Sequence, residues 1–548
     1  MRKLAVILLS LFFVAACGKE PANEAGPAPA INATALAAHI KTLSSDEFGG
    51  RGPATPGEEL TINYMAGQFK KFGLKPGMGD SYFQDVPLVS ITARPDAVMS
   101  IAGKGDPLSL TYGDEMMVWT KRVVDTAAVS DSEMVFVGYG IVAPEYGWND
   151  YAGIDVKGKT VVILVNDPGY ATQDEALFTG NAMTYYGRWT YKYEEAARQG
   201  AAAAIIIHRT APAGYPWEVV SGSWSGPQFD LVRADDNMSR VAIEGWLTEA
   251  SARRVLKKAG LSLDALDAAA ARRGFKAVPL GLALSVKVDN TVSRSRSHNV
   301  IAWLPSSEKP DEYFLYMAHW DHLGTDPTIK GDGIYNGALD NASGSAALLQ
   351  LAEAFGSLKK APGRSVVFIS VTAEEQGLLG SAHYAANPVF PLAKTVGGLN
   401  MDGINIIGPT RDITVTGYGA SDLDGIMERL AQAQGRVVRP DPAPEKGYYY
   451  RSDHFELAKR GVPMIYPNAG INHVVYGAEW GQRQSDDYVA KRYHKPADEY
   501  DPAWDLSGAV QDINLYFRFG QTVANSDKWP NWHDGNEFRA IRDASRAP

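Results

Sequence analysis

At 548 residues the chain is too long for one ordinary hydrophobic core, so we expect two or more domains. With 45% hydrophobic and 21% charged residues, its composition is that of a soluble globular protein. The formal net charge of -10 leaves no basic stripe that could neutralise phosphates, so nucleic acid is excluded as a partner.

The first 17 residues have the layout of an export signal. The basic segment MRK precedes the apolar run LAVILLSLFFV, which is too short to span a membrane comfortably. The following VAAC, which ends at Cys17, resembles the lipobox of bacterial lipoproteins; the alternative is a plain signal peptide. The resemblance implies a membrane anchor through a lipid on Cys17, with Gly18 favouring the outer membrane facing the periplasm, or else secretion. Cys17 is the only cysteine, so no disulfide forms within one chain after lipidation.

Residues 18–33 are rich in Pro, Ala and Gly without periodicity, which is typical of a flexible tether. The next segment, 34–124, begins with two predicted helices, 34–43 with Thr34 as N-cap and 57–73 ending at Gly73. Several strand-like pieces follow to about residue 120.

The sequence pattern changes between residues 125 and 285, where we predict a separate β-rich module. Apolar strand candidates alternate there with helical stretches, among loops rich in Gly, Tyr and Trp. The predicted strands are 134–141, 159–166 and 203–208, and the predicted helices are 191–199 and 248–260, the latter capped by Thr248.

The last part, 286–548, reads as strand, helix, strand, which is the pattern of an α/β domain. We expect a mixed, mostly parallel sheet flanked by helices. The predicted strands are 298–304, 312–319, 364–371, 396–401 and 463–467, and a helix is predicted at 343–358.

Side chains that can bind metals follow several of these elements. Ligands in open α/β sheets gather beyond the carboxyl ends of the strands, so side chains at those ends are expected to converge. Each one alone also fits a structural role, such as a helix cap, a turn residue or a solvated acid. The residues concerned are His319, Asp340, Glu374, Glu375, Asp402 and His494.

Five of these residues satisfy the ligand count of a two-metal site. Imidazoles and carboxylates suit zinc or a similar divalent ion. Two metals with five protein ligands need one bridging carboxylate and two further ligands each. The set that meets this count is His319, Asp340, Glu375, Asp402 and His494, which leaves Glu374 unassigned. Asp321, two residues beyond His319, is predicted to accept the second imidazole N–H of His319.

The order of these motifs resembles peptidase family M28, a family of co-catalytic zinc peptidases. A second resemblance concerns FVGYGI (136–141) and AGIDVKGKTVVIL (152–164), which are similar to the protease-associated (PA) domain that many of these peptidases carry. The segments similar to family M28 are HWD (319–321), GALDNASG (337–344), EEQGLLGS (374–381), NMD (400–402), SDHFELAKRGVPMIY (452–466) and HKPAD (494–498).

The resemblance implies a role for each matching residue. His319 and Asp402 would hold one zinc ion, Glu375 and His494 the other, and Asp340 would bridge them. Glu374 would be the catalytic general base, and the peptide bond between Asp340 and Asn341 would be cis. The domains implied are a lipoprotein signal at 1–17, a tether at 18–33, the N-terminal part of the peptidase domain at 34–124, an inserted PA-like domain at 125–285 and the catalytic domain at 286–548.

The adjacent acids Glu374 and Glu375 suit a division of labour. A two-metal site polarises the scissile carbonyl and lowers the pKa of a water molecule, and an uncoordinated carboxylate then moves that water's proton to the leaving amine. Because adjacent residues on an extended backbone point in opposite directions, the chain is expected to leave regular strand geometry at this pair.

The four residues before Ser452 are candidates for the substrate pocket. Tyr448, Tyr449 and Tyr450 fit either an oxyanion donor or pocket wall, or a packed aromatic loop. Arg451 is a candidate for gripping a substrate carboxylate. Trp320 is expected to face away from the metals, and a structural role is expected for His322, His383, His454 and His473.

The sequence therefore predicts a lipid-anchored or secreted exopeptidase with two zinc ions, most simply an aminopeptidase acting on peptides, with the PA-like module restricting access. Three alternatives remain open: a carboxypeptidase of the same family, a glutaminyl cyclase, which usually uses one zinc, and a receptor-like relative without catalysis. The preferred residue, the physiological peptide, the native metal and the oligomeric state are not determined by the sequence.

Overall fold

The computed structural model describes residues 29–96 and 98–547. The predicted export signal, Cys17 and most of the tether therefore lie outside the described residues. Among the residues that are described, no helix is both long and apolar enough to cross a membrane.

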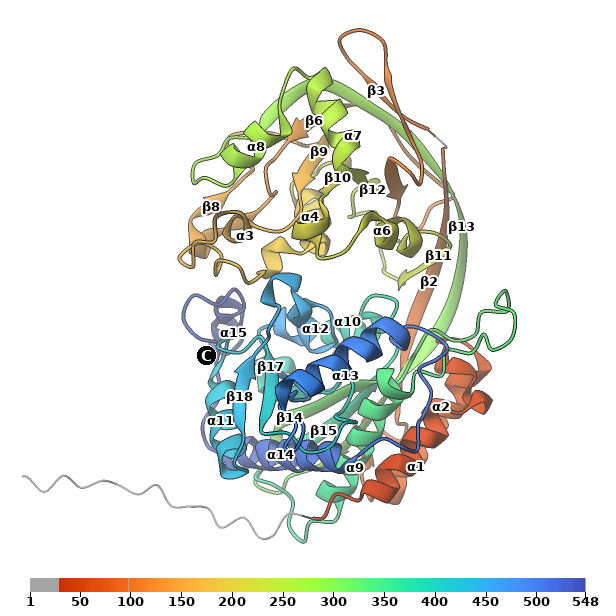
Figure 1. Cartoon of the computed structure of the whole chain (residues 1–548), viewed down its shortest axis with the longest axis vertical. Coiled ribbons are helices and arrows are strands. Elements are labelled where there is room, and N and C mark those ends of the chain that lie inside the picture. Colours follow the sequence, from red (N-terminus) through yellow and green to blue (C-terminus); the bar gives the residue numbers. More distant parts are fainter. Residues whose placement is uncertain (1–28, 97, 548) are drawn as a thin grey trace, which may run out of the picture.

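Two compact parts are joined by a pair of long antiparallel strands (Figure 1). β2 (Phe83–Pro95) and β13 (Val278–Leu304) pair continuously, from Phe83 opposite Val300 to Pro95 opposite Val288. We call the part that contains the chain after β13, together with the N-terminal helices, the lower domain. The part formed by the residues between β2 and β13 is called the inserted module.

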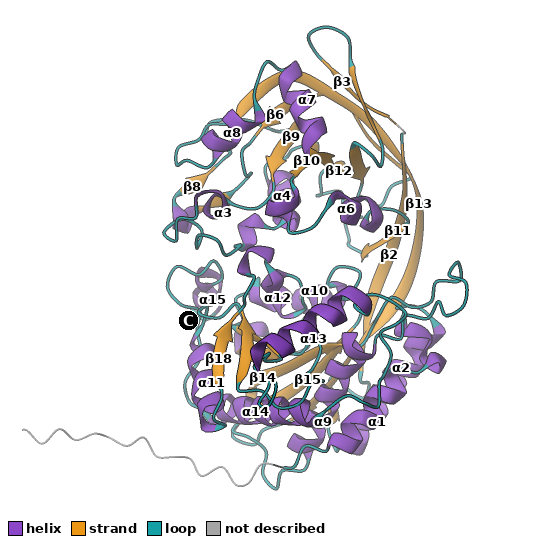
Figure 2. Ribbon diagram, viewed as in Figure 1, coloured by secondary structure: helices purple, strands orange, loops and turns teal. Residues whose placement is uncertain are grey.

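The sheet of the lower domain is mixed, with parallel strands at its centre (Figure 2). Its strands are β1 (Lys75–Pro76), β14 (Lys309–His319), β15 (Arg364–Val371), β16 (Thr395–Asn400), β17 (Asp412–Thr416), β18 (Val437–Pro440) and β19 (Met464–Asn468). β15, β14, β16 and β19 are successive parallel neighbours, while β13 pairs antiparallel to β15 and β17 pairs antiparallel to β19. The predicted mixed, mostly parallel sheet is confirmed.

Helices cover both faces of this sheet, which explains why its strands are almost continuously apolar. On β14, Phe314 and Tyr316 pack with α1, α2, α9 and α14, while Leu315 and Met317 pack on the opposite face with α10 and α12. The helices of the lower domain are α1 (Ala33–Leu43), α2 (Pro56–Lys71), α9 (Gly344–Gly356), α10 (Leu379–Ala386), α11 (Asp422–Ala433), α12 (His454–Ala458), α13 (Gly477–Lys491), α14 (Ser507–Asn525) and α15 (Arg539–Ser545).

The inserted module has its own hydrophobic core around a parallel group of strands, β6, β9, β10 and β12. Its strands are β3 (Val98–Ala102), β4 (Leu108–Thr111), β5 (Met116–Trp119), β6 (Thr126–Phe136), β7 (Val142–Ala143), β8 (Trp148–Asn149), β9 (Thr160–Leu164), β10 (Ala203–His208), β11 (Pro227–Leu231) and β12 (Ile243–Thr248). Its helices are α3 (Pro168–Thr172), α4 (Trp189–Arg198), α5 (Thr210–Ala213), α6 (Trp217–Ser223), α7 (Glu249–Lys258) and α8 (Leu263–Ala270).

The structure differs from the sequence-based expectation at two places. The strands β3 and β5 lie in the stretch that was assigned to the peptidase domain, yet β3 pairs with β13 and β5 with β12, so the inserted module begins before residue 125. Helix α1 is capped by Asn32 rather than Thr34, because the Asn32 side chain accepts the backbone N–H groups of Thr34 and Ala35.

Candidate active site

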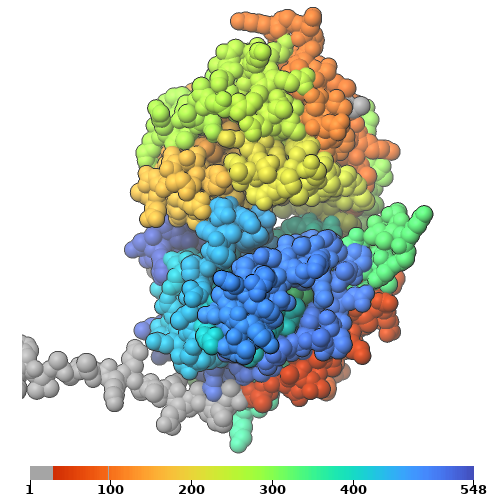
Figure 3. Space-filling model, in the orientation of Figure 1, coloured from red at the N-terminus to blue at the C-terminus, as the bar shows by residue number. Residues whose placement is uncertain are grey.

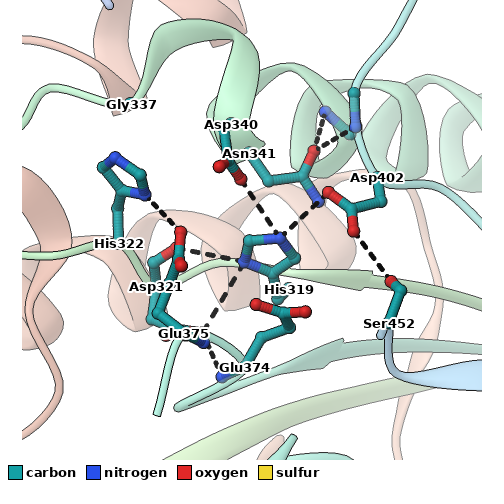
Figure 4. Close-up of polar contacts among 12 residues, drawn as sticks. His319, Asp321, His322, Gly337, Asp340, Asn341, Glu374, Glu375, Asp402 and Ser452 are labelled. Atoms are coloured by element: carbon teal, nitrogen blue, oxygen red, sulfur yellow. Dashed lines mark hydrogen bonds and ion pairs between the residues drawn. The ribbon is translucent and has the colours of Figure 1, made fainter. Parts of the chain in front are cut away.

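The candidate ligands come together at the carboxyl end of the parallel strands, as predicted. Figure 4 labels all of them except His494. His319 is the last residue of β14, and Asp402 follows two residues after the end of β16. Asp340 lies in the tight turn before α9, and its peptide bond to Asn341 is cis, which confirms that expectation. His494 comes from the loop that follows α13.

Asp340 lies between the two imidazoles. Its Oδ1 is 3.5 Å from Nε2 of His319, and its Oδ2 is 3.1 Å from Nε2 of His494. The same nitrogen of His319 lies 3.3 Å from Oδ1 of Asp402, and that of His494 lies 3.1 Å from Oε2 of Glu375. The five side chains thus form two neighbouring groups that share one carboxylate.

These separations fit the donor atoms of a metal centre. Ligand atoms placed about 2.0–2.1 Å from a zinc ion at tetrahedral angles lie about 3.3 Å apart. The donor atoms of His319, Glu374 and Asp402 all lie within 4.8 Å of one another, as do those of His322, Asp340 and Glu375. The carboxylates of this cluster are largely buried, and buried negative charge requires nearby cations that compensate it.

Asp321 has a different role from the one predicted. Nδ1 of His319 lies 3.1 Å from the backbone carbonyl oxygen of Asp321 and 3.8 Å from its carboxylate. The carboxylate instead accepts the backbone N–H of Glu374 at 3.0 Å and is 3.4 Å from that of Glu375. Asp321 therefore fixes the backbone of the acidic pair, and only its main chain orients the imidazole.

The chain leaves strand geometry between β15 and the acidic pair, as expected. Ala373 has a positive φ of 51°, a conformation uncommon for a residue with a side chain. The carbonyl of Glu374 then accepts the N–H groups of Gly377 and Leu378 at 2.9 Å, which closes a turn. Glu374 and Glu375 consequently reach different groups of the cluster.

His322 contacts the cluster, although it was expected to be structural. Its Nδ1 lies 2.6 Å from Oε1 of Glu375, the oxygen that does not face His494. His322 is fully buried, and the spacing HWDH, with three polar residues after one strand end, was the signal available in the sequence.

The charges of the cluster perturb its pKa values in opposite directions. Burial raises the pKa of the Glu374 carboxyl well above its ordinary value, against the opposing charge of His319. Burial acts in the same direction on Glu375, but the imidazoles of His322 and His494 bring its pKa well below the ordinary value. Burial tends to lower the pKa of His494, whereas its hydrogen bonds to Asp340 and Glu375 raise it to about 10.

Neighbouring polar groups hold the ligands in place. Ser452 Oγ donates to Oδ2 of Asp402 at 2.8 Å. The Asp498 carboxylate accepts the backbone N–H of Asp340 at 3.1 Å. The Asn341 side chain donates to the carbonyl of Met401 and accepts the N–H of Gly403, which ties the two ligand loops together.

Arg51 supports the same loops from a segment that was not assigned to the site. It is 1% exposed, and it donates to the carbonyls of Trp320, Asn336 and Gly337, which flank His319, Asp321 and Asp340 in the chain, as well as to that of Leu43. More than 260 residues separate Arg51 from these loops, so no local pattern in the sequence indicated the contact.

The tyrosine run at 448–450 makes packing contacts and does not line the cluster of candidate ligands. The Tyr449 hydroxyl donates to the Met464 carbonyl at 3.2 Å, and the Tyr450 hydroxyl lies 3.1 Å from Glu537. Tyr448 is 41% exposed and stacks on the Arg451 guanidinium.

Trp320 and His454 are both buried in packing contacts, as expected from the sequence. Trp320 is fully buried, and its Nε1 donates to the His298 carbonyl. His454 lies buried between Tyr449 and Tyr466.

The imidazoles and carboxylates gathered at the strand ends form a candidate metal centre. Residues 299–518 match the model of "Peptidase family M28".

Three curated relatives match parts of the chain. A "Probable zinc metalloprotease" of Pyrenophora teres f. teres (strain 0-1) is 43% identical over 86 residues, or 16% of this chain and 18% of that protein. "Aminopeptidase NAALADL1" of Mus musculus is 33% identical over 129 residues (23% and 16%). A "Glutamate carboxypeptidase 2 homolog" of Caenorhabditis elegans is 33% identical over 205 residues (36% and 24%). The chain therefore spans less than a quarter of the length of these relatives.

Among solved structures, the aminopeptidase from Aneurinibacillus sp. strain AM-1 is similar to this chain. It is 20% identical, the match covers 91% of this chain and 95% of that one, and the TM-score is 0.47.

Proposed function

We propose that the protein is a two-zinc exopeptidase that releases N-terminal amino acids from peptides. The observation that carries the proposal is the position of Asp340, whose two carboxylate oxygens face His319 and His494 separately. His319 and Asp402 would hold one zinc ion, Glu375 and His494 the other, and Asp340 would bridge them. Zinc is supported by a relative named as a zinc metalloprotease.

When bound, the two zinc ions polarise the scissile carbonyl and lower the pKa of the attacking water. Glu374 accepts the proton of that water and passes it to the nitrogen of the leaving amine. Asp321 keeps the Glu374 backbone in place during both transfers through the 3.0 Å hydrogen bond.

Two named relatives point to different ends of the peptide, since one is an aminopeptidase and the other a glutamate carboxypeptidase homolog. The deciding experiment compares amino-acyl chromogenic substrates with peptides blocked at the N-terminus, and includes N-terminal glutaminyl peptides. Cleavage of the unblocked substrates alone supports the aminopeptidase. Cleavage of blocked peptides from the C-terminus supports the carboxypeptidase, cyclisation supports the cyclase, and no turnover at full zinc content supports a receptor-like protein.

We further propose that the inserted module restricts access to the site and that the chain is held by a lipid on Cys17 at the outer membrane. The first point is tested by deleting the module and comparing the peptide lengths that are hydrolysed. An unchanged length preference would contradict it. The second is tested by labelling with a radioactive fatty acid in a bacterial host, where a Cys17→Ser variant is expected to lose both label and membrane association.

A further inference from the structure

The inserted module contains a cavity that none of the candidate metal ligands lines. Its volume of about 340 Å³ lies in the range of about 300–1,000 Å³ that is usual for small-molecule sites. Tyr139 follows β6, Val165 follows β9 and Arg209 follows β10, so the cavity lies at the carboxyl ends of three parallel strands. This is the edge where ligands bind in open α/β sheets. Figure 3 shows the segments around residues 170 and 265, which form two of its walls, next to each other on one side of the module.

The charged groups of this cavity compensate each other. Nη1 of Arg209 donates to Oδ2 of Asp267 at 2.8 Å. A second acid, Glu249, lies 3.9 Å from Nε of Arg209, but its charge is compensated by Arg253 at 2.7 Å. A ligand with a net charge would upset this balance, so the lining favours a neutral ligand.

Two phenol hydroxyls of the lining lack partners. Tyr139 and Tyr170 form hydrogen bonds through their backbone atoms, and among the described residues nothing bonds to either hydroxyl. Tyr139 is 3% exposed. Burial and the charge of Asp267 raise the pKa of its phenol while the charge of Arg209 opposes them, so the hydroxyl lies near the ion pair of the cavity. A buried hydroxyl without a hydrogen bond is costly, and a ligand that bonds to it removes the cost.

Two side-chain amides complete the polar lining. Nε2 of Gln173 donates to Oδ1 of Asn181 at 3.3 Å and to the carbonyl of Tyr170 at 2.6 Å. The carboxamide oxygen of Gln173 accepts no hydrogen bond from the part of the chain that the structure describes. The cavity thus presents planar groups that hold donors and acceptors at fixed spacings, next to aromatic rings. Vicinal hydroxyls on a rigid ring match such spacings, because each hydroxyl both donates and accepts.

We infer that this cavity binds a sugar, either a free monosaccharide or the terminal sugar of a glycan. A sugar is neutral, and its hydroxyls can pair with Tyr139, Arg209 and Asp267 together. Its C–H face can pack on the ring of Tyr170, as apolar groups do on aromatic rings. Sugar binding at this place requires no hydrolytic activity, so the site is independent of the proposed peptidase function.

The first test titrates sugars into the full-length zinc-loaded protein and follows binding by saturation-transfer NMR. The probes are glucose, galactose, mannose and N-acetylglucosamine, with glycine and acetate as charged comparisons. At least one sugar is expected to bind with a Kd on the order of 1 mM or below, and neither charged probe is. Absence of binding by all four sugars, or tighter binding of glycine or acetate, would overturn the site. The methyl glycoside of the bound sugar identifies the source, since only a terminal glycan unit tolerates the added methyl group.

Variants then assign the binding to the cavity. Tyr139→Phe removes only the hydroxyl and is expected to raise the Kd by about 3–10-fold. Asp267→Asn breaks the ion pair that orients Arg209, and we expect a Kd higher by about tenfold or more. Asp264→Asn is the matched control on the same helix, because Asp264 pairs with exposed Arg253 outside the cavity. Circular dichroism verifies that each variant is folded, and an unchanged Kd in both cavity variants would contradict the assignment.

Removal of zinc separates this site from the candidate active site. Chelator-treated protein, kept below its melting temperature, is expected to bind the sugar with the same Kd, because all residues that line the cavity belong to the inserted module. Loss of binding without zinc and its recovery with zinc would place the sugar at the metal cluster and overturn the site. Equal binding in both states would support the site whether or not the protein hydrolyses peptides.

Discussion

The carboxylates of Glu374 and Glu375 belong to consecutive residues but lie in different groups of the cluster. Glu375 is 3.1 Å from His494 and 2.6 Å from His322, whereas Glu374 gathers with His319 and Asp402. The Asp321 carboxylate and the turn at Ala373 hold the backbone that separates them. Glu375 therefore faces His494 and His322 while Glu374 faces His319 and Asp402, an arrangement that fits the proposed roles of ligand and general base.

Replacing Glu374 by Gln should abolish turnover and keep the metals. We expect kcat to fall by about 10²–10⁴-fold, because the amide cannot accept the proton of the attacking water. Zinc content, measured by atomic emission, should stay at the wild-type value. Glu375→Gln is the matched comparison and should lose zinc, because it removes a ligand. Near wild-type turnover in Glu374→Gln would exclude the assigned role.

Removal of the metals should inactivate the enzyme and lower its melting temperature. Without cations, the clustered carboxylates repel one another, and a ligand that binds only the folded state stabilises it. Titrating zinc into chelator-treated protein should restore activity and give a break in the binding curve at two equivalents per chain. A break at one equivalent would favour the single-zinc alternative.

Asp321→Asn should reduce activity through the acidic pair. The amide can still accept one N–H, but it brings a donor group toward the backbone of Glu374 and Glu375. We expect a loss of about 10–100-fold in activity or zinc affinity, as is common for groups that support metal ligands. Asp311→Asn, on an exposed part of β14, is the control and should behave like wild type. Full activity in Asp321→Asn would show that the carboxylate is dispensable.

Arg51→Met should destabilise the lower domain strongly. It leaves four carbonyls without their donor. A buried hydrogen-bonding group left without its partner costs about 1–3 kcal/mol, so we expect the loss of stability to be about 3 kcal/mol or more. Urea unfolding of the metal-free protein separates this effect from zinc binding, and exposed Arg94→Met serves as control. A change below about 1 kcal/mol, within the range typical of surface substitutions, would contradict the assignment of Arg51 as a loop anchor.

Stability should also fall in mild acid because of His39. Burial, followed by the charge of Lys71, lowers the pKa of His39 from 6.5 to about 4 in the folded protein. The unfolded chain thus binds the proton more readily, so the contribution of His39 is complete above pH 6.5 and is lost as the pH falls towards 4. The loss is on the order of 3 kcal/mol. His39 Nδ1 lies 2.7 Å from the Tyr64 hydroxyl. His39→Gln keeps a polar group for this contact and should show a smaller decline in stability between pH 7 and 4.5 than wild type.

Much of the lower domain was predictable because its signals are local. β15 was predicted at its observed bounds, since a short run of apolar residues bounded by polar turns is typical of a buried strand. The start of the inserted module was misplaced because the sequence pattern of a strand, as in β3 and β5, does not depend on which strands it pairs with. Pairing with β12 and β13 is decided by contacts more than 120 residues away.

The candidate ligands were also predictable, because parallel strands bring their ends to one edge of the sheet. The residues that act through contacts with the backbone were not predictable from the sequence. The carboxylate of Asp321 reaches the amides of the acidic pair only because Ala373 adopts a positive φ, and His322 reaches Glu375 only through the path of its loop. Arg51 contacts residues distant in the chain, which a single sequence does not reveal.

The chain enters and leaves the inserted module side by side, and this makes the module removable in principle. β2 and β13 stay in register over their whole paired length, with Leu88 opposite Ser295. Joining the two strands at such a facing pair through a two-residue turn would convert the ladder into an ordinary β-hairpin. The remaining pairs would keep their partners, so the lower domain could be produced alone without shifting any strand. An excision between positions that do not face each other, such as 125 and 285, would instead leave strand residues without pairing partners and so expose strand edges. The register of this ladder therefore determines where the gene can be cut.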